Sequence, residues 1–185
     1  SIIAHQLKSP LSVIKGYLEA LISGDCGRIN SLQREYISDA LENVEEMKKN
    51  IDELLVVQRV EEGKFKIVPK PISLGEITSN ILNDFSFWAR AQNCQLVFKK
   101  PEDLPPALGD PRVIRGVIEN LISNAIKYSQ GKGKVEVSIT LRKKDKKIIF
   151  SCKDNGIGIE KKDFKKVFTK FYRSGRAIEL DPTGN

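Results

Sequence analysis

The sequence predicts an α+β protein: an N-terminal helical hairpin that forms a four-helix bundle as a dimer, followed by a two-layer α/β sandwich. Apolar residues recur every three or four positions through most of the first 55 residues. Apolar and polar residues then alternate over 135–141 and 148–152, as in half-buried strands. Residues 1–60 hold 7 Lys and Arg against 9 Asp and Glu, and the remainder hold 24 against 15. This change from net −2 to net +9 favours two domains, over residues 1–62 and 63–185.

The first expected helix covers residues 1–23, with apolar side chains spaced as in a coiled-coil seam. These are Ile3, Leu7, Leu11, Ile14, Leu18 and Leu21. Pro10 should bend this helix near Gln6, because it removes one amide donor. The glycines at positions 24 and 27 end the helix.

The second expected helix begins at Asn30, an N-cap residue with Gln33 three positions later, as in a capping box. Its apolar stripe consists of Ile37, Ala40, Val44, Met47, Ile51 and Leu54. The helix closes around residues 61–63. A lone hairpin cannot bury both apolar stripes, so we expect a two-fold homodimer that completes a four-helix bundle.

Strand and helix signals alternate in the second half of the chain. The expected strands are 65–68, 95–98, 135–141 and 148–152. Ser73 begins a helix that runs to about Ala91, and Asp110 followed by Pro111 begins another. The last two strands are joined by a lysine-rich turn and have one apolar face, which helices should cover.

The composition excludes several classes of protein. No apolar run approaches the roughly 18 residues needed to span a bilayer, and no secretory signal is present. Three distant cysteines and a single histidine argue against structural zinc and favour reduced thiols in a cytosolic domain. Lysines of the second half are interleaved with acidic residues, so we expect no nucleic-acid partner.

A pair of asparagines and a glycine motif predict a nucleotide site. Asn120 and Asn124 are one helical turn apart, so both amide oxygens can point at the same ion. Neutral oxygen ligands suit Mg²⁺ that is also held by substrate phosphates. Asp154 precedes Gly156 and Gly158, where the backbone can approach a flat ring closely.

Four segments resemble the motifs of sensor histidine kinases of two-component systems, in the order and spacing of that family. They are an H box at 1–11, an N box at 120–125, a first glycine box at 154–158 and an F box at 168–173. The resemblance covers essentially the whole chain. It implies a dimerisation and phosphotransfer domain, then a catalytic ATP-binding domain with the fold of gyrase, Hsp90 and MutL-type ATPases.

The resemblance also implies the chemistry. ATP would phosphorylate His5, and an aspartate of a response-regulator receiver domain would then take the phosphoryl group. A neutral imidazole nitrogen can attack the γ-phosphorus. The chain would be the cytoplasmic portion of a membrane-anchored sensor, with membrane contact only through segments outside these residues.

The nucleotide-binding residues follow from the same resemblance. Lys127 would contact phosphate, Tyr128 would line the adenine, and Asp154 would accept a hydrogen bond from the adenine amine. Gly156 and Gly158 would keep the loop open to the base. The F box would contribute Phe168, Phe171 and Arg173. The two phenylalanines have helical spacing and are equally compatible with core and lid positions.

Four features depart from the family pattern or bear on the alternatives. Gln6 stands where the family has an acidic residue; it can accept a hydrogen bond but cannot take a proton, so autophosphorylation should be slower. Ser9 lies four residues after His5, at the position whose side chain, in the family, helps to place the water that attacks the phosphorylated regulator. The second glycine box would begin at 181–185. A non-catalytic dimeric scaffold, or pseudokinase, is therefore the alternative, whereas Asn120 disfavours an ATP-hydrolysing clamp because it cannot act as a base.

Overall fold

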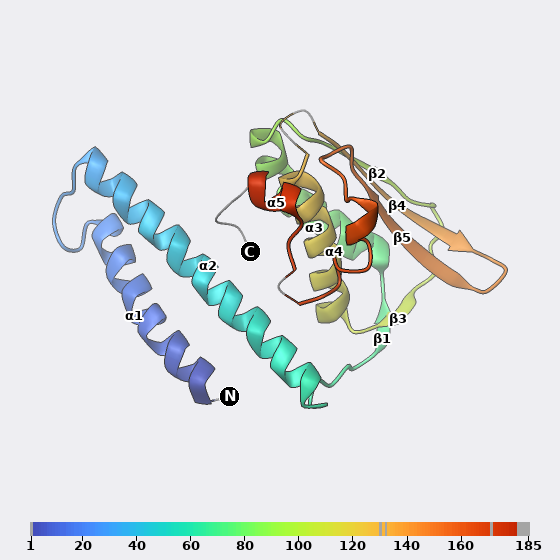
Figure 1. The fold of residues 1–185 in the computed structure, drawn as a ribbon, viewed down its shortest axis with the longest axis horizontal. Helices are drawn as coiled ribbons and strands as arrows, with labels where there is room; N and C mark the ends of the chain where they lie inside the picture. The colour runs from blue at the N-terminus through green and yellow to red at the C-terminus, as the bar shows by residue number, and fades with distance from the viewer. Residues whose placement is uncertain (1, 130, 132, 171, 181–185) are drawn as a thin grey trace. The chain divides into compact units, whose positions relative to one another are not determined.

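The computed structural model describes the backbone of residues 2–129, 131, 133–170 and 172–180, and the side chains of these residues from Gln6 onward. The chain divides into two compact units, Ser1–Lys66 and Ile67–Asn185 (Figure 1). Over the described ranges, no helix is both long and apolar enough to cross a membrane.

The first unit is a hairpin of two long helices, α1 (Ile2–Ser23) and α2 (Ser31–Glu61). α1 continues through Pro10. The predicted capping box begins α2: the Asn30 side chain accepts the Gln33 N–H at 2.8 Å, and the Gln33 side chain accepts the Asn30 N–H at 2.9 Å. These reciprocal bonds satisfy two backbone donors that the first helical turn leaves unpaired.

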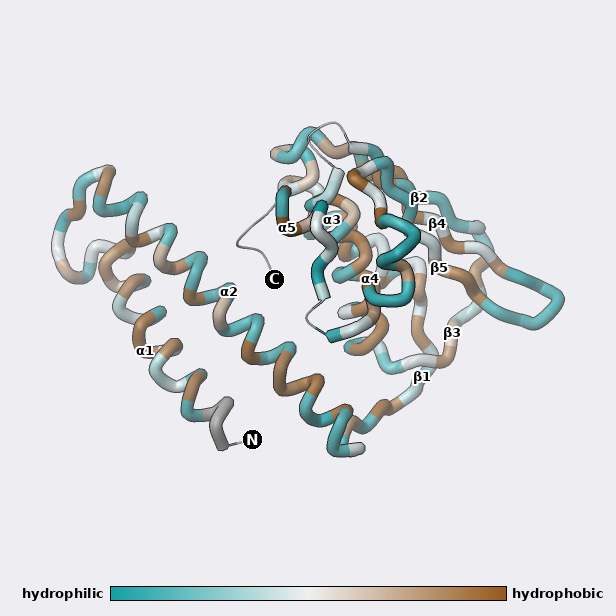
Figure 2. Tube along the Cα trace, viewed as in Figure 1, coloured by the Kyte–Doolittle hydropathy of each residue, from teal (hydrophilic) through white to brown (hydrophobic). Residues whose placement is uncertain are grey.

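The hairpin buries little of its apolar stripe. Among the described residues of this unit, only Leu11 and Val44 are buried hydrophobic residues. Leu7 is 49% exposed and Met47 is 54% exposed, although both belong to the predicted stripes. Figure 2 shows hydrophobic residues recurring along both helices. Ion pairs Lys8–Asp52 and Lys15–Glu45 join the two helices beside these apolar positions.

The described residues of the second unit form two small sheets. One pairs β1 (Lys70–Ile72) antiparallel with β3 (Ala107–Gly109). The other has the order β2-β4-β5 and consists of β2 (Gln95–Lys99), β4 (Lys134–Arg142) and β5 (Lys147–Lys153). β2 runs parallel to β4, and β4 runs antiparallel to β5 with Val137 opposite Cys152.

Two helices pack on the three-stranded sheet and form the second layer, α3 (Leu74–Ala91) and α4 (Pro111–Lys127) (Figure 1). The side chains at the centre of the core are almost completely enclosed. They are Ile81 from α3, Ile118, Ile122 and Ile126 from α4, and Val135, Val137 and Ile139 from β4. The predicted two-layer α/β arrangement is therefore confirmed.

One predicted strand is wrong. Residues 65–68 form no strand, and the chain enters the sheet later, at β1. Ile67 is 58% exposed, and the Val68 N–H is taken by the Asp110 carboxylate instead of a neighbouring strand. Ile67 and Val68 therefore face solvent, whereas Phe65 is half-buried. The short strand β3, which pairs with β1, has no clear signal in the sequence.

Candidate functional site

The helix α4 presents its two asparagines away from the core. Its start is fixed as predicted, with Asp110 as the N-cap residue and Pro111 in the first helical turn. The buried positions Ile118, Ile122 and Ile126 recur every four residues. Asn120 and Asn124 lie between them in the sequence and are exposed, on one face of the helix.

The end of α4 carries the next two predicted residues. Lys127 is its last residue and Tyr128 is its C-cap, whose N–H donates to the Asn124 carbonyl at 3.0 Å. Both side chains are half-buried. The Lys127 ammonium lies 5.8 Å from the centroid of the Tyr128 ring, within the range of a cation–π contact. This contact places a cation and an aromatic ring together at the end of α4, the asparagine helix.

The glycine loop docks directly on this helix end. The Ile157 N–H donates to the Tyr128 carbonyl at 3.1 Å. A Cβ atom on Gly156 would overlap that same carbonyl group, so only glycine fits there. The Asp154 carboxylate accepts the Gly156 N–H at 3.0 Å, which closes a local turn. The structure thus brings Tyr128, Asp154 and Gly156 together, while Gly158 adopts a positive φ of 67°.

Two residues that sequence reasoning missed also hold this loop. The Asn155 side-chain oxygen accepts the Lys134 N–H at 2.7 Å, tying the loop to the start of β4. Arg176 donates to the Ile157 carbonyl at 3.0 Å and pairs with Glu160 at 3.3 Å. The only sequence signal for Asn155 is its place between Asp154 and Gly156, and Arg176 carries none.

The strand before the loop supplies a thiol that stays protonated. Burial raises the pKa of the Cys152 thiol to about 11, and the nearby Asp154 carboxylate acts in the same direction. The Cys152 sulfur lies 3.8 Å from the Leu121 carbonyl oxygen of α4. A neutral thiol in this position packs against the helix and is a poor nucleophile near pH 7.

The segment after the glycine loop consists of a short 3₁₀ turn (Lys161–Asp163), further turns and helix α5 (Gly175–Leu180). The Tyr172 hydroxyl donates to the buried Asp163 carboxylate at 2.6 Å, and this bond raises the pKa of Tyr172. Arg173 donates to the Ala177 carbonyl at 3.2 Å, so that part of its guanidinium faces α5.

The two phenylalanines of the F box have different outcomes. Phe168 is 93% exposed in a turn, so the core alternative is wrong for it. Phe171 lies outside the described residues. Helical spacing from Phe168 to Phe171 does not correspond to a helix over the described residues 164–170, which form turns and a bend.

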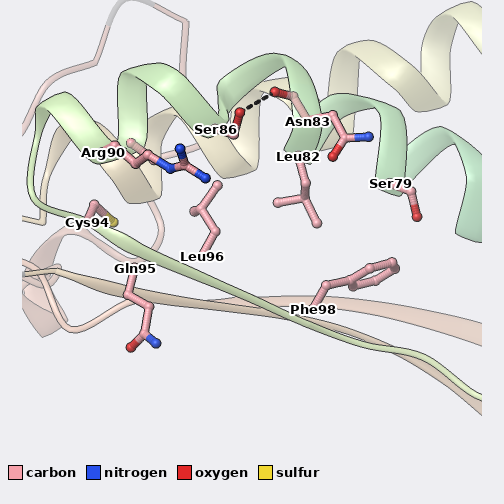
Figure 3. Close-up of a pocket in the computed structure, with 10 residues that line it drawn as sticks. Ser79, Leu82, Asn83, Ser86, Arg90, Cys94, Gln95, Leu96 and Phe98 are labelled. Carbon is pink, nitrogen blue, oxygen red and sulfur yellow. Dashed lines mark hydrogen bonds between the residues drawn. The ribbon is translucent and has the colours of Figure 1, made fainter.

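The described part of this unit has cavities of about 410 Å³ at two places. One is lined by Ile157, Arg176, Glu179 and Leu180 and therefore adjoins the glycine loop. The other lies between α3 and β2, with Arg90 and Phe98 among its lining residues, and contains none of the predicted site residues (Figure 3).

The donor set on α4 suits a hard cation shared with phosphates. Among the described residues, no group of three or more His, Cys, Asp and Glu could hold a metal ion. Asn120 and Asn124 instead offer exposed neutral oxygens on one helix face. That set fits Mg²⁺, which usually takes few protein ligands when substrate phosphates also bind it.

The predicted phospho-acceptor region lies on the first unit. His5 belongs to α1, and its side chain lies outside the described residues. Gln6 and Ser9 are exposed on the same helix. Lys8, between them, is paired with Asp52 of α2.

Both halves of the chain match known families. Residues 1–63 match the His Kinase A (phospho-acceptor) domain. Residues 109–184 match the histidine kinase-, DNA gyrase B- and HSP90-like ATPases. A phospho-acceptor hairpin followed by an ATPase domain of this kind defines the class, and the chain belongs to the sensor histidine kinases, as its motifs predict.

Curated relatives are members of the same family. The chain is 30% identical to the sensor histidine kinase WalK of Bacillus subtilis, over 98% of this chain and 30% of that protein. It is 28% identical to the circadian input-output histidine kinase CikA of Synechococcus elongatus, over 95% of this chain and 23% of that protein. The chain thus spans less than a third of the length of these relatives.

Solved structures share the fold. Full-length ShkA in complex with AMPPNP matches with a TM-score of 0.80 at 19% identity, over 97% of this chain and 38% of that chain. The histidine kinase ThkA in complex with the response regulator protein TrrA matches with a TM-score of 0.59 at 18% identity, over 92% of this chain and 49% of that chain.

Proposed function

We propose that this chain is the kinase core of a two-component sensor, in which ATP phosphorylates His5 and a response-regulator aspartate then receives the phosphoryl group. The observation that carries the proposal is the docking of the Asp154–Gly158 loop on the end of the asparagine helix. In this proposal the Asp154 carboxylate binds the nucleobase, and the amide oxygens of Asn120 and Asn124 hold a phosphate-bound cation. Membership of the sensor histidine kinases supports the same reaction.

In this proposal each residue of the site binds a different part of the nucleotide. One oxygen of Asp154 already accepts the Gly156 N–H, so its other oxygen is available for the adenine amine. Tyr128 lines the adenine, and Lys127 contacts phosphate. Asn120 and Asn124 would hold Mg²⁺, which when bound neutralises charge on the phosphates.

The remaining predicted residues have roles at the edges of the site. Gly156 and Gly158 let the loop backbone approach the base; the absence of a side chain at Gly156 also lets the loop dock on the Tyr128 carbonyl. Phe168, Phe171 and Arg173 belong to the segment that covers the nucleotide. The complex of a structural neighbour with AMPPNP supports ATP as the ligand.

At the acceptor, a neutral nitrogen of His5 attacks the γ-phosphorus, the bond from this phosphorus to the bridging oxygen breaks, and ADP leaves. The other nitrogen must be oriented or deprotonated. Gln6 can orient it but cannot remove its proton at neutral pH, so transfer is slow. Ser9 would help to place the water during dephosphorylation of the regulator. Asn120 lacks a basic group that could activate water, which favours transfer to His5 over hydrolysis.

The proposal includes partners, domain limits and location. The exposed stripes of α1 and α2 favour a homodimer that completes a four-helix bundle. A receiver domain is the second partner, supported by the ThkA complex with its regulator. We assign residues 1–62 to dimerisation and phosphotransfer and 63–185 to ATP binding, in the cytoplasmic portion of a membrane-anchored sensor.

A dimeric scaffold without kinase activity is the second candidate, and the exposed Gln6 beside His5 favours it. The two candidates differ in one product. The kinase forms an acid-labile phosphoramidate on the chain, which the scaffold does not form. An ATP-hydrolysing clamp would release phosphate without labelling the protein.

A further inference from the structure

The first observation concerns how α2 ends. Gly63, which follows the C-cap residue Glu62, adopts a positive φ of 65°. Its N–H donates to the Val60 carbonyl at 3.1 Å, and the Lys64 N–H donates to the Arg59 carbonyl at 2.9 Å. These two bonds form a Schellman motif. The hydrogen bonding of the helical unit therefore extends through Lys64.

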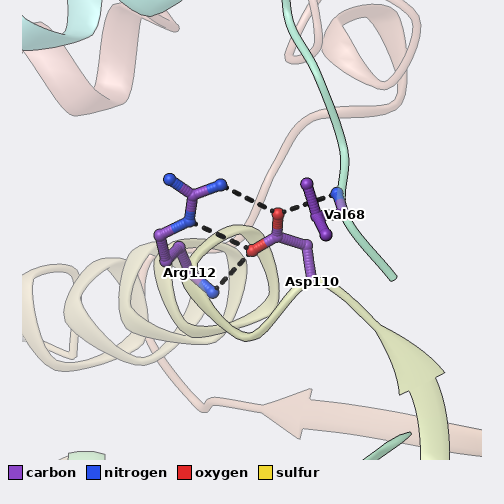
Figure 4. Close-up of polar contacts among 3 residues, drawn as sticks. All are labelled: Val68, Asp110 and Arg112. Carbon is purple, nitrogen blue, oxygen red and sulfur yellow. Dashed lines mark hydrogen bonds and ion pairs between the residues drawn. The ribbon is translucent and has the colours of Figure 1, made fainter. Parts of the chain in front are cut away.

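The second observation concerns where the α/β unit begins. Asp110 is 2% exposed, and its carboxylate accepts the Val68 N–H at 3.1 Å, from 42 residues earlier in the chain. The same carboxylate accepts the Arg112 N–H at 3.0 Å and pairs with the Arg112 guanidinium at 3.1 Å (Figure 4). One buried carboxylate thus caps α4 and also holds the backbone that leads into β1.

Between these two anchors lie only Phe65, Lys66 and Ile67. In the part of the chain that the structure describes, no backbone hydrogen bond is recorded for these three residues. Their side chains are half-buried or exposed. From Lys70 onward the backbone is paired with β3, Lys70 standing opposite Gly109. The unanchored linker is therefore very short.

We propose that Asp110 is a positioning residue that restricts the hinge between the two units to residues 65–67. Three residues reach about 10 Å at most, whereas the five residues 65–69 would reach about 17 Å if the Asp110 bond were lost. Asp110 also begins α4, which carries Asn120 and Asn124. It therefore limits how far the asparagine helix travels from the unit that carries His5; its relevance to phosphoryl transfer rests on the proposed function.

Amide hydrogen exchange measured by NMR on the 185-residue chain tests the anchor without any need for activity. The Val68 amide hydrogen should exchange at least about 30-fold more slowly than those of residues 65–67, because the Val68 N–H is bonded to the buried Asp110 carboxylate. In Asp110→Ser the hydroxyl still caps α4 but is too short to reach Val68, so this protection should disappear. Asp145→Ser, which removes an exposed carboxylate paired with Arg142, should leave it intact.

Proline variants test the same bond from the donor side. Val68 precedes Pro69 and is therefore already confined to extended backbone, which proline also adopts. Val68→Pro removes the donor and replaces the side chain. Ile67→Pro adds a proline to the hinge and keeps the Val68 donor. Val68→Ala keeps the donor and removes the side chain.

The hinge itself is measured as a distance distribution between two spin labels. Cys26 is exposed in the helical unit and accepts one label, and Lys144→Cys at the β4–β5 turn accepts the other. Each labelled chain carries both labels, and labelled chains are diluted with unlabelled chains so that the measured distance lies within one protomer. Asp110→Ser and Val68→Pro should broaden the distribution by about 5 Å or more, while Ile67→Pro, Val68→Ala and Asp145→Ser should not.

Two results would overturn the proposal. One is exchange of the Val68 amide within about threefold of residues 65–67 in the unaltered chain. The other is an unchanged distance distribution in both Asp110→Ser and Val68→Pro. Neither result depends on nucleotide or phosphorylation, so failure of the hinge and failure of the kinase proposal are distinguishable.

Discussion

The helical unit and the α/β unit differ in how completely each encloses its own apolar residues. Among the described residues, the hairpin buries only Leu11 and Val44, whereas the core cluster of the α/β unit holds eleven buried residues. The hairpin helices are also linked by ion pairs between partly exposed side chains, which contribute little to stability. The α/β unit therefore has a hydrophobic core of its own, whereas the hairpin leaves most of its apolar stripe half-buried or exposed.

This difference indicates how the two halves divide their tasks. The α/β unit holds the glycine loop against α4 by backbone contacts, and such a site needs a rigid scaffold. The hairpin leaves its apolar stripe partly exposed, and in our proposal a second copy covers it. We therefore expect substitutions in the α/β core to change folding, and substitutions in the stripe to change assembly.

The largest expected effect comes from opening the α/β core. Ile122→Ala removes a fully buried side chain between α4 and the sheet and should destabilise this unit by about 2–5 kcal/mol. Leu108→Ala is the control, because this exposed side chain should change stability by no more than about 0.5 kcal/mol. Denaturant unfolding measures both. Equal losses in the two variants would show that the α/β unit has no specific core at Ile122.

A charge in the hairpin stripe should act on assembly. Met47→Glu places a carboxylate where a second copy should bury the side chain, which costs about 2 kcal/mol or more and weakens the dimer at least about 30-fold. Glu46→Gln, on the neighbouring exposed position, should leave the dimer intact. Sedimentation over a concentration series reports the mass. A monomer for the unaltered chain at micromolar concentration would contradict the four-helix bundle.

Docking of the glycine loop can be broken at one backbone position. Gly156→Ala introduces a Cβ that overlaps the Tyr128 carbonyl, so the loop should move away and ATP affinity should fall at least about tenfold, or 1.4 kcal/mol. In Gly116→Ala of α4 the new Cβ meets no neighbour within 4 Å, and nucleotide binding should be unchanged. Calorimetry with a non-hydrolysable analogue compares them. Unchanged ATP affinity in Gly156→Ala would show that docking of the loop does not contribute to nucleotide binding.

Acid should loosen the α/β unit through Asp110. The Arg112 side chain and the Val68 N–H hold the pKa of this carboxyl well below its usual range. Its contribution to stability is therefore fully present above the unfolded pKa of about 4 and is lost as pH falls toward the folded pKa. Thermal unfolding from pH 6 down to pH 2 should show a shallower acid decline in Asp110→Ser than in the unaltered chain. Parallel declines would assign the acid sensitivity to other carboxylates.

The sequence predicted elements whose signals are local. The capping box at Asn30 and the Asp110–Pro111 start of α4 each depend on residues within one turn, and the structure confirms both. The buried and exposed faces of α4 follow from the spacing of its isoleucines. Membership of the family followed from motifs that combine such local patterns.

Contacts between distant segments could not be predicted in this way. The strand expected at 65–68 failed because the Val68 N–H is bonded to Asp110, and the short pairing of β1 with β3 depends on residues far apart in sequence. The same is true of the site, where Asn155 bonds β4 and Arg176 bonds the glycine loop. Polar residues of this kind reveal no partner until the chain is folded.

Incubation of the chain with γ-³²P-labelled ATP and Mg²⁺ tests the phospho-acceptor role of His5 most directly. Millimolar nucleotide keeps the site occupied even at weak affinity. Label should appear on the protein, be lost in acid and survive alkali, and be absent from His5→Gln and from Asp154→Ala. Label that withstands acid or persists in His5→Gln, or phosphate release without labelled protein, would contradict a histidine kinase in which α1 carries the acceptor and the α/β unit holds the nucleotide.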